Sequence, residues 1–265
     1  MGKLKGKVAI ITGAARGNGE GAARVMAREG ATAVLTDIMD QVHETAKSIQ
    51  EDGYKAVSFK MDVTKPAEVK DVVRKVLAQL GKIDILVNNA GIMRGFRLVD
   101  MPDEERDRQF DVNIKGAFNC AKAVLPDMIE HRYGKIINIS SVTGPMVADI
   151  GHCAYGATKA ALWGFTRALA LEVAEYGINV NAICPGYILT PWIRISAGKR
   201  NPGNPDAVLN QWAKQIPMGR LGTIEELGEL AAFLASDESK YITGTPVIID
   251  GGNTIPESGI GYQEA

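Results

Sequence analysis

The chain is 265 residues long, with 46% hydrophobic residues, 23% charged residues and a formal net charge of −1. This length suggests one large or two modest domains, and the near-neutral charge argues against nucleic acid as the main partner. No run of eighteen apolar residues occurs, so we predict no membrane-spanning segment. Three widely spaced cysteines, Cys120, Cys153 and Cys184, favour reduced thiols and a cytoplasmic location. We predict no metal site, because neither Cys-x-x-Cys nor His-x-x-x-His occurs.

Seven short apolar runs recur at a steady interval along the chain, and each is rich in β-branched residues. Near-continuous apolar character is typical of strands that are buried on both faces of a parallel sheet. In chain order, the predicted strands are Val8–Thr12, Thr32–Asp37, Ala56–Asp62, Ile83–Asn89, Lys135–Ser141, Ile178–Ile183 and Pro246–Asp250.

Segments with helical spacing lie between these runs. One opens on glycines and covers residues 19–30, and another has Pro66 near its first turn and Gly81 after its last. Two longer helical segments are predicted for residues 102–131 and 154–177. Because strands and helices alternate, we predict an α/β fold with a doubly wound (Rossmann) parallel seven-stranded sheet, helices on both faces, and a single domain over residues 1–265.

The region from Tyr187 to Ile216 departs from this alternation. It contains the stretch SAGKRNPGNPD, which is rich in Gly, Pro and Asn, and long loops of this kind usually serve as lids or binding loops. We therefore predict an irregular substrate lid around residues 187–216. Residues 253–265 are interpreted as a tail after the last strand.

Residues 8–24, VAIITGAARGNGEGAAR, combine a strand, a glycine-rich turn and a helix start. Glycine allows the backbone to approach a pyrophosphate closely, and the helix N-terminus offers free N–H groups and a positive dipole end. The spacing of Gly13, Gly17 and Gly19 is not the G-x-G-x-x-G pattern, so the loop alone is a weak indication of dinucleotide binding.

The end of the second predicted strand carries a carboxylate, Asp37, eighteen residues after Gly19. A nicotinamide dinucleotide site needs an acid there to hold the adenosine ribose hydroxyls. The next residue is Ile38 rather than Arg or Lys, so a 2′-phosphate would meet a negative charge without a basic partner. We predict NAD(H) in preference to NADP(H), with Arg16 as the possible phosphate partner that keeps NADP(H) open.

Several motifs, in order, resemble the short-chain dehydrogenase/reductase family, and the match runs in register from about Lys5 to Gly252. The motifs are TGAARGNG, NNAG at residues 88–91, Asn113, Ser141, YGATK at residues 155–159, and Pro185-Gly186 followed by Thr190. The resemblance implies an oxidoreductase that transfers a hydride between NAD(H) and a secondary alcohol or ketone of medium size. It also implies a homotetramer or homodimer acting on a small molecule.

The resemblance assigns roles to matching positions. Tyr155 is the expected acid/base and Lys159 its electrostatic partner and ribose ligand. Ser141 is expected to polarise the carbonyl, and Asn113 to hold a water in a proton relay. The expected cofactor contacts are Gly13, Arg16, Gly17, Asn18, Gly19, Asp37, Ile38, Asp62, Val63, Asn89, Ala90, Gly91, Tyr155, Lys159, Pro185, Gly186, Ile188 and Thr190. Asn18 departs from the apolar residue usual in the family, which puts the packing on the nicotinamide side in doubt.

Spacing supports this chemistry independently. Residues i and i+4 share one helix face, so Tyr155 and Lys159 point the same way if their segment is helical. A free phenol has a pKa near ~10, too high for a base at neutral pH. We expect the ammonium of Lys159, together with the positive ring of the oxidised cofactor, to lower the pKa of Tyr155. Ser141 would donate a hydrogen bond to the substrate oxygen as charge develops there.

Other interpretations of the same residues stay open. A Ser–His–Asp hydrolase could use Ser141, His152 and Asp149, but the G-x-S-x-G elbow is missing and His152 is better interpreted as a turn or pocket-edge residue. A non-enzymatic NAD-binding regulator on the same fold is the second alternative. Hydroxysteroids, polyols or sugars, and 3-oxoacyl thioesters are all candidate substrates. The residues expected to face the substrate are Ser141, Met93, Arg94, Met146, Val147, Tyr187 and Trp192.

Overall fold

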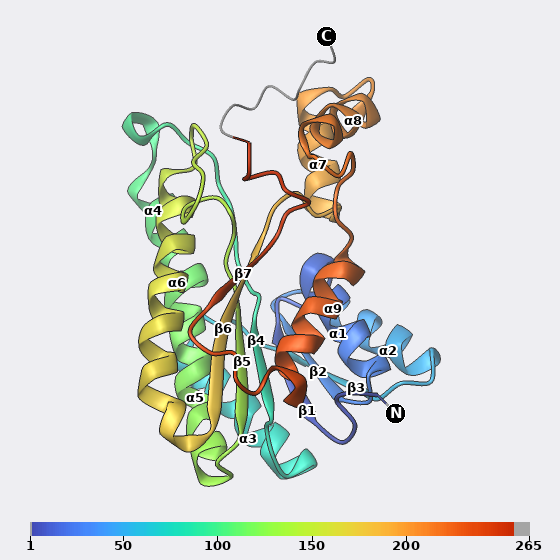
Figure 1. Cartoon of the computed structure of the whole chain (residues 1–265), viewed down its shortest axis with the longest axis vertical. Helices are drawn as coiled ribbons and strands as arrows, with labels where there is room; N and C mark the ends of the chain where they lie inside the picture. The colour runs from blue at the N-terminus through green and yellow to red at the C-terminus, as the bar shows by residue number, and fades with distance from the viewer. Residues whose placement is uncertain (1, 257–265) are drawn as a thin grey trace.

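The computed structural model describes residues 2–256, so most of the predicted tail, residues 257–265, lies outside the described part. Within it, seven strands form one parallel sheet in the order β3-β2-β1-β4-β5-β6-β7, which confirms the predicted sheet (Figure 1). The strands are β1 (Val8–Thr12), β2 (Thr32–Asp37), β3 (Ala56–Lys60), β4 (Ile85–Asn88), β5 (Gly134–Ile139), β6 (Ile178–Pro185) and β7 (Pro246–Ile249).

Helices cover both faces of the sheet (Figure 1). One face carries α1 (Gly17–Arg28), α2 (Gln41–Glu51) and α9 (Ile224–Ala235); the other carries α3 (Pro66–Leu80), α5 (Gly116–Glu130) and α6 (Cys153–Val173). Side chains alternate between the faces along each strand. Ile10 and Val34 therefore join the core under α3, α5 and α6, whereas Ile11 and Leu35 join the core under α1, α2 and α9. This two-sided burial explains why the strands read as continuous apolar runs.

The predicted helix over residues 102–131 is interrupted. It consists of α4 (Asp103–Phe110), a π-helical turn (Asp111–Lys115) and α5. A π turn adds one residue to a helix and is frequent at functional sites. The sequence analysis did not predict this π turn, because one extra residue hardly changes the hydrophobic periodicity of such a long segment.

The prediction of an irregular region from Tyr187 to Ile216 is wrong. That region contains α7 (Pro191–Arg200) and α8 (Pro205–Gln215), which lie together above one end of the sheet (Figure 1). Thr190 and Asn204 cap the two helices, and each is followed by a proline in the first helical turn. Of the residues that indicated a loop, Asn201, Asn204 and Pro205 mark helix ends, Gly198 lies inside α7, and only Pro202 and Gly203 lie in the turn between the helices. Across residues 2–256, no helix is both long and apolar enough to cross a membrane.

Candidate active site

The glycine loop between β1 and α1 is too crowded for larger residues. A Cβ on Gly19 would lie 2.3 Å from the carbonyl oxygen of Gly13, and one on Gly13 would lie 2.8 Å from the Cα of Ala90. Gly13 and Gly17 also have positive φ values of 65° and 64°. The loop backbone is therefore held close to the end of β4, and only glycine fits at these positions.

The first turn of α1 opens toward the carboxyl edge of the sheet. Arg16 precedes the helix in an extended conformation, is exposed, and caps none of the helix N–H groups within the described structure. The first N–H groups of a helix need partners from outside it and attract anions. The structure thus places a helix start without a side-chain cap at the position where the sequence predicted a pyrophosphate site.

Thr12 and Asn89 join the ends of β1 and β4. The backbone N–H groups of Asn89 and Ala90 each donate to the Thr12 hydroxyl, at 3.0 Å in both cases. The Asn89 amide donates to the carbonyl oxygens of Thr12 and Gly13, at 2.8 and 2.9 Å. These bonds fix the glycine loop against the loop that follows β4.

Asp37 lies at the end of β2 with its carboxylate turned toward the glycine loop. The N–H of Ala15 donates to one oxygen at 3.1 Å and the N–H of Met39 donates to the other at 2.9 Å. A carboxylate has about four acceptor positions, so two are left for other donors. Ile38 beside it is 61% exposed and brings no positive charge.

Asp62 and Val63 follow β3. The Asp62 carboxylate accepts from the N–H and the hydroxyl of Thr64, which shapes a tight turn. Val63 is buried, and its carbonyl oxygen accepts a hydrogen bond from Asn119 of α5. A Cβ on Gly116 would lie 2.6 Å from the Val63 side chain, so α5 begins in direct contact with this loop.

Asn113 is placed by the π turn and clamps the loop after β4. Its amide donates to the Ile92 carbonyl oxygen and to the Thr158 hydroxyl, both at 2.9 Å, and its oxygen accepts from the Ile92 N–H at 2.8 Å. Both amide hydrogens are thus used, while the oxygen keeps one free acceptor position. A Cβ on Gly91 would lie 3.3 Å from this oxygen and 3.5 Å from Lys159 Nζ, so Gly91 separates the two groups.

Ser141 and Tyr155 approach each other because the loop after β5 touches the first turn of α6. A Cβ on Gly144 would lie 2.3 Å from the Gly156 carbonyl oxygen, and Gly144 has a φ of +113°, so this contact requires glycine. The Ser140 hydroxyl donates to the carbonyl oxygen of Lys159 at 2.7 Å and thereby ties β5 to α6.

Burial dominates the electrostatics of the Tyr155 and Lys159 pair. Burial raises the pKa of the Tyr155 phenol; a hydrogen bond with Ser141 opposes this and the Asp149 carboxylate adds to it. Burial lowers the pKa of Lys159 to about 8. Lys159 Nζ lies 5.6 Å from the Tyr155 ring centroid and donates to the Ile139 carbonyl oxygen at 2.7 Å. In the protein alone burial is the largest influence and the pKa of Tyr155 is raised; the lowering expected with the oxidised cofactor stays a prediction.

The end of β6 supplies the remaining predicted cofactor positions. The Pro185 carbonyl oxygen accepts from the Val142 N–H at 3.1 Å, and Gly186 N–H donates to the Ile249 carbonyl oxygen at 3.0 Å. Ile188 is buried. Thr190 caps α7 through the Ile193 N–H at 3.3 Å, and its side chain would lie 3.6 Å from a Cβ on Gly17. The start of α7 therefore borders the glycine loop.

The sequence of this chain is similar to known proteins over nearly its whole length. A profile described as enoyl-(acyl carrier protein) reductase, from the short-chain dehydrogenase/reductases, matches residues 13–254. The oxidoreductase UcpA of Salmonella typhimurium is 52% identical over 258 residues, which cover 97% of this chain and 98% of that protein. The chain belongs to the short-chain dehydrogenase/reductase family.

Two further relatives show how widely substrates vary around this scaffold. The 3-oxoacyl-[acyl-carrier-protein] reductase FabG of Thermotoga maritima is 41% identical over 254 residues, covering 96% of this chain and 100% of that protein. The ligand-free aldohexose dehydrogenase of Thermoplasma acidophilum superposes with a TM-score of 0.89 and is 34% identical, covering 99% of each chain. One relative is named for an acyl thioester and the other for a sugar, so membership in the family leaves the substrate class open.

The glycine loop of this short-chain dehydrogenase/reductase fits a dinucleotide. Beyond the crowding at Gly13 and Gly19, the side-chain oxygen of Asn18 is buried and has no hydrogen-bond partner among residues 2–256. Buried polar atoms are rarely left without a partner, and this one lies in the loop predicted to contact the cofactor. A cradle that excludes side chains and an acceptor that needs a donor are both features expected of a cofactor site.

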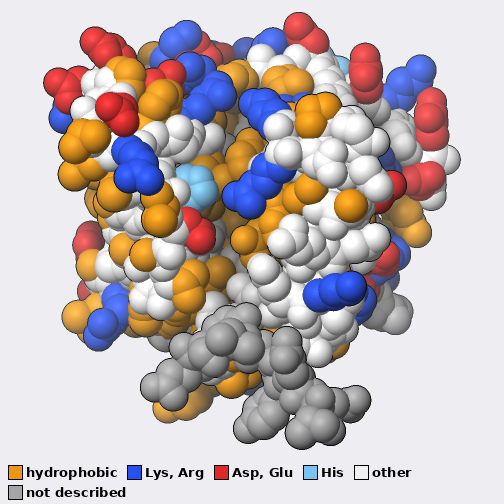
Figure 2. All heavy atoms as spheres, turned by 90° about the horizontal axis from the view of Figure 1, so that it is seen from above, with side chains coloured by type: hydrophobic (Ala, Val, Ile, Leu, Met, Phe, Trp, Pro, Cys, Tyr) orange, Lys and Arg blue, Asp and Glu red, His pale blue; other side chains and the backbone are white. Residues whose placement is uncertain are grey.

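The predicted substrate residues follow β4, β5 and β6, at the carboxyl edge of the sheet. Figure 2 shows the molecule from above, with a hollow in this face and Lys and Arg side chains at its rim. Tyr187 stacks on Trp212 of α8, with ring centroids 5.6 Å apart. Met93 and Met146 are half-buried; the other three predicted residues, Arg94, Val147 and Trp192, are exposed. Arg94 Nε lies 3.9 Å from a carboxylate oxygen of Glu105.

Two residues outside the predicted site, His152 and Asp149, lie near Tyr155. The His152 ring lies edge-on to the Tyr155 ring, with centroids 6.2 Å apart, and Asp149 acts electrostatically on the same phenol. The sequence shows both in a turn of small and polar residues, where no periodicity indicates which side chains face the site.

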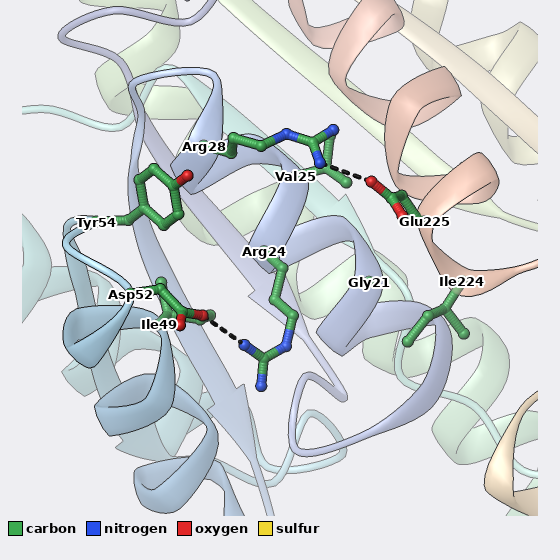
Figure 3. A pocket seen from close by; sticks show the side chains of 9 residues that line it. All are labelled: Gly21, Arg24, Val25, Arg28, Ile49, Asp52, Tyr54, Ile224 and Glu225. Atoms are coloured by element: carbon green, nitrogen blue, oxygen red, sulfur yellow. Dashed lines mark hydrogen bonds and ion pairs between the residues drawn. The ribbon is translucent and has the colours of Figure 1, made fainter.

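A second hollow, of about 520 Å³, lies on the far side of α1 (Figure 3). Arg24 pairs with Glu20 and Asp52, and Arg28 pairs with Glu225. Because carboxylates already neutralise both guanidinium groups, we assign no ligand to this hollow.

Proposed function

We propose that the chain catalyses the NAD-dependent oxidation of a secondary alcohol of medium size, and the reverse reduction of the ketone. One observation carries this proposal: Ser141, Tyr155 and Lys159 converge at the sheet edge, next to a loop in which Gly13 and Gly19 leave no room for a Cβ. A protein that only sensed NAD would not need a proton donor there.

The residues expected to hold the cofactor divide along its length. The backbone of Gly13, Gly17 and Gly19 would accommodate the pyrophosphate, and Asp37 would accept hydrogen bonds from the adenosine ribose. Asp62, Val63 and Asn89 would line the adenosine half, and Thr190 would bond the carboxamide. When bound, the nicotinamide supplies the hydride chemistry, while the protein supplies position and field.

Tyr155 is the proposed proton acceptor in oxidation and proton donor in reduction. Ser141 would donate a hydrogen bond to the substrate oxygen and stabilise the charge that develops there. Because the pKa of Lys159 is about 8, this lysine is largely protonated at neutral pH, and its charge would favour the phenolate once Tyr155 has lost its proton. Asn113 would hold a water through its free acceptor position.

A substrate panel with both cofactors tests the function. Secondary alcohols and ketones are supplied to the purified full-length chain, and reduced nicotinamide is followed by its absorbance. We expect Tyr155→Phe to reduce kcat by about 10²- to 10⁴-fold, the range of general acid–base catalysis. Tyr241→Phe is the matched control, because Tyr241 is fully exposed. NAD binding without Tyr155-dependent turnover of any compound would instead support the non-enzymatic regulator.

Cofactor choice rests on Asp37. Its carboxylate is fixed by two backbone N–H groups, and Ile38 beside it offers no charge to a 2′-phosphate. We expect Asp37→Ala to weaken NAD binding and to reduce the preference over NADP by about tenfold or more, the value of a charge-assisted hydrogen bond. An unchanged preference in this variant would contradict the assignment of Asp37.

We also propose a cytoplasmic homotetramer or homodimer, with α7 and α8 as the substrate lid. The reduced cysteines support the location. On the outer face of α5 and α6, Phe118 stacks on Phe165 at 3.9 Å and is 49% exposed, which favours a partner subunit there. Light scattering of the purified chain measures the oligomeric state, and a monomer would contradict this assembly.

A further inference from the structure

The turn between Ser141 and Tyr155 carries a connected set of polar side chains. The Thr143 N–H donates to the Ser141 hydroxyl at 3.1 Å, and the Thr143 hydroxyl donates to an Asp149 carboxylate oxygen at 3.2 Å. His152 Nδ1 lies 3.7 Å from the same oxygen of Asp149. The set therefore leads from the catalytic serine to the ring beside the catalytic tyrosine.

Asp149 lies where it acts on two phenols that come from different elements. Its charge raises the pKa of Tyr155 at the start of α6 and contributes to the raised pKa of Tyr187 after β6. The contacts place Asp149 in the same region, because it is bonded to Thr143 next to Ser141 and lies 3.7 Å from the His152 ring, which is edge-on to Tyr155.

His152 is held in place but keeps free hydrogen-bonding capacity. The Phe96 N–H donates to the Gly151 carbonyl oxygen at 2.8 Å, which ties the turn to the loop after β4. Nδ1 of His152 is buried and forms no hydrogen bond within the described chain. Nε2 lies beside Gly95, where a Cβ would come within 3.5 Å, and it too forms no hydrogen bond within the described chain.

Three arginines around this turn and on α7 already have a partner among the described residues. Arg94 faces Glu105 at 3.9 Å, Arg194 faces Asp206 at 4.0 Å, and the Arg200 guanidinium lies 5.3 Å from the Trp212 ring centroid. An anionic substrate would meet Asp149 near the reacting centre, whereas a hydroxyl would find an acceptor there. The charge pattern thus favours uncharged, hydroxylated compounds.

We propose that Asp149 and His152 bind a second hydroxyl of the substrate, on the carbon next to the one that reacts. The substrates are then vicinal diols in oxidation and α-hydroxyketones in reduction. This inference rests on the proposed dehydrogenase function and narrows it to polyhydroxylated, uncharged compounds. Asp149 accepts a hydrogen bond from this hydroxyl, and the imidazole of His152 donates a hydrogen bond to the same oxygen.

A matched pair of ring compounds tests this inference. The full-length chain with NAD is given trans-cyclohexane-1,2-diol or cyclohexanol, and kcat/KM is measured for each. We expect the diol to be preferred by about tenfold or more, the value of a hydrogen bond to a charged group. In Asp149→Ala and His152→Ala the ratio should fall to within about threefold of one. Both compounds use Tyr155, so changes in the Tyr155 pKa cancel in the ratio.

The controls separate substrate binding from folding. His131→Ala removes a histidine that also lies near a carboxylate, Asp127, on α5, and should leave the ratio unchanged. His152→Gln keeps a donor and an acceptor and should retain more of the preference than His152→Ala. Turnover of cyclohexanol by each variant reports that the site is intact.

The outcomes distinguish this inference from the function on which it rests. Turnover of cyclohexanol with no preference for the diol, or a preference that survives both alanine variants, overturns the role of Asp149 and His152 and leaves the dehydrogenase function standing. Absence of Tyr155-dependent turnover across the whole panel overturns both.

Discussion

The cofactor side of the site, formed by β1–β4 and the loops after them, is built differently from the substrate side, formed by the turn 141–155 and by α7–α8. On the cofactor side, missing side chains define the geometry, because Gly13 and Gly19 lie too close to backbone atoms for any Cβ. On the substrate side, the geometry depends on exposed side chains such as Asp149 and Trp192.

This difference separates the part of the site that cannot accept substitutions from the part whose side chains can change. A backbone cradle tolerates almost no substitution, so it suits a ligand that stays the same. Exposed side chains on a turn and on two short helices can be exchanged at little cost in stability. If the proposed function is right, the molecule holds its cofactor with backbone atoms and selects its substrate with side chains.

The largest effect should come from filling the cradle. Gly19→Ala places a methyl group 2.3 Å from the Gly13 carbonyl oxygen, so the loop must move. We expect overpacking to lower the free energy of unfolding by about 1–3 kcal/mol, and the Kd for NAD to rise about a hundredfold. Urea unfolding and titration with NAD measure the two quantities.

Gly164→Ala is the matched control for this change. Gly164 lies inside α6, and a Cβ there would meet nothing within 4 Å among the described residues. Alanine should be neutral or stabilise by about 0.5–1 kcal/mol. Equal changes in stability and NAD binding for Gly19→Ala and Gly164→Ala would contradict the distinction between glycines of the loop and glycines of a helix.

A pH-dependent effect should follow from the buried Lys159. Its pKa falls from 10.5 to about 8 on folding, so the unfolded chain binds more protons between these values and stability rises with pH there. From pH 7 to 10, the unfolding free energy should rise by about 2 kcal/mol relative to Lys159→Met. Urea unfolding at several pH values measures it.

Lys47→Met serves as the control for this comparison, because Lys47 is well exposed on α2. It should follow the wild-type protein over the same pH range. If the difference in unfolding free energy between the wild type and Lys159→Met is constant from pH 7 to 10, the pKa of Lys159 is not lowered by burial.

A smaller effect should come from the substrate side. Trp212→Ala removes the ring that stacks on Tyr187, in a cluster of α7 and α8 separate from the two main cores. We expect KM for the alcohol to rise about tenfold, with the Kd for NAD changed by less than about twofold. Steady-state kinetics and NAD titration compare the two. An equal rise in KM for the alcohol and in Kd for NAD would show that the substrate side and the cofactor side are not independent.

The smallest effect concerns the charge of Asp149. Because that charge raises the pKa of Tyr155, Asp149→Asn should lower it, so the phenolate forms at lower pH. The pH profile of kcat/KM for oxidation of cyclohexanol should move to lower pH. Asp103→Asn, at an exposed ion pair on α4, should leave the profile in place. Movement to higher pH would contradict the placement of Asp149.

Much of the fold could be predicted because the physics is local. The alternating burial of Ile10 and Ile11 requires a run that is apolar at every position, and such a run is visible in the sequence. The helices α7 and α8 could also have been predicted, because Thr190-Pro191 and Asn204-Pro205 are each a capping residue followed by a first-turn proline. They were missed because glycines and prolines were interpreted as loop residues.

The site divides in the same way. The glycine loop and the Tyr155–Lys159 pair each lie in a short segment of the chain, so the resemblance of motifs sufficed to predict them. The direction of the Tyr155 pKa depends on burial and on Asp149, neither of which spacing reveals. The position of His152 depends on a hydrogen bond between two loops far apart in the chain, and no local pattern encodes it.

The π turn at Asp111–Lys115 has a consequence for engineering. Removing one residue there would restore regular helical bonding, and would turn everything on one side of the cut by about 100° relative to the other. Asn113 would then no longer form its hydrogen bonds with Ile92 and Thr158. The buried face of α5, which includes Cys120, Val124 and Met128, would turn with it, so we expect the deletion to lower both the free energy of unfolding and turnover.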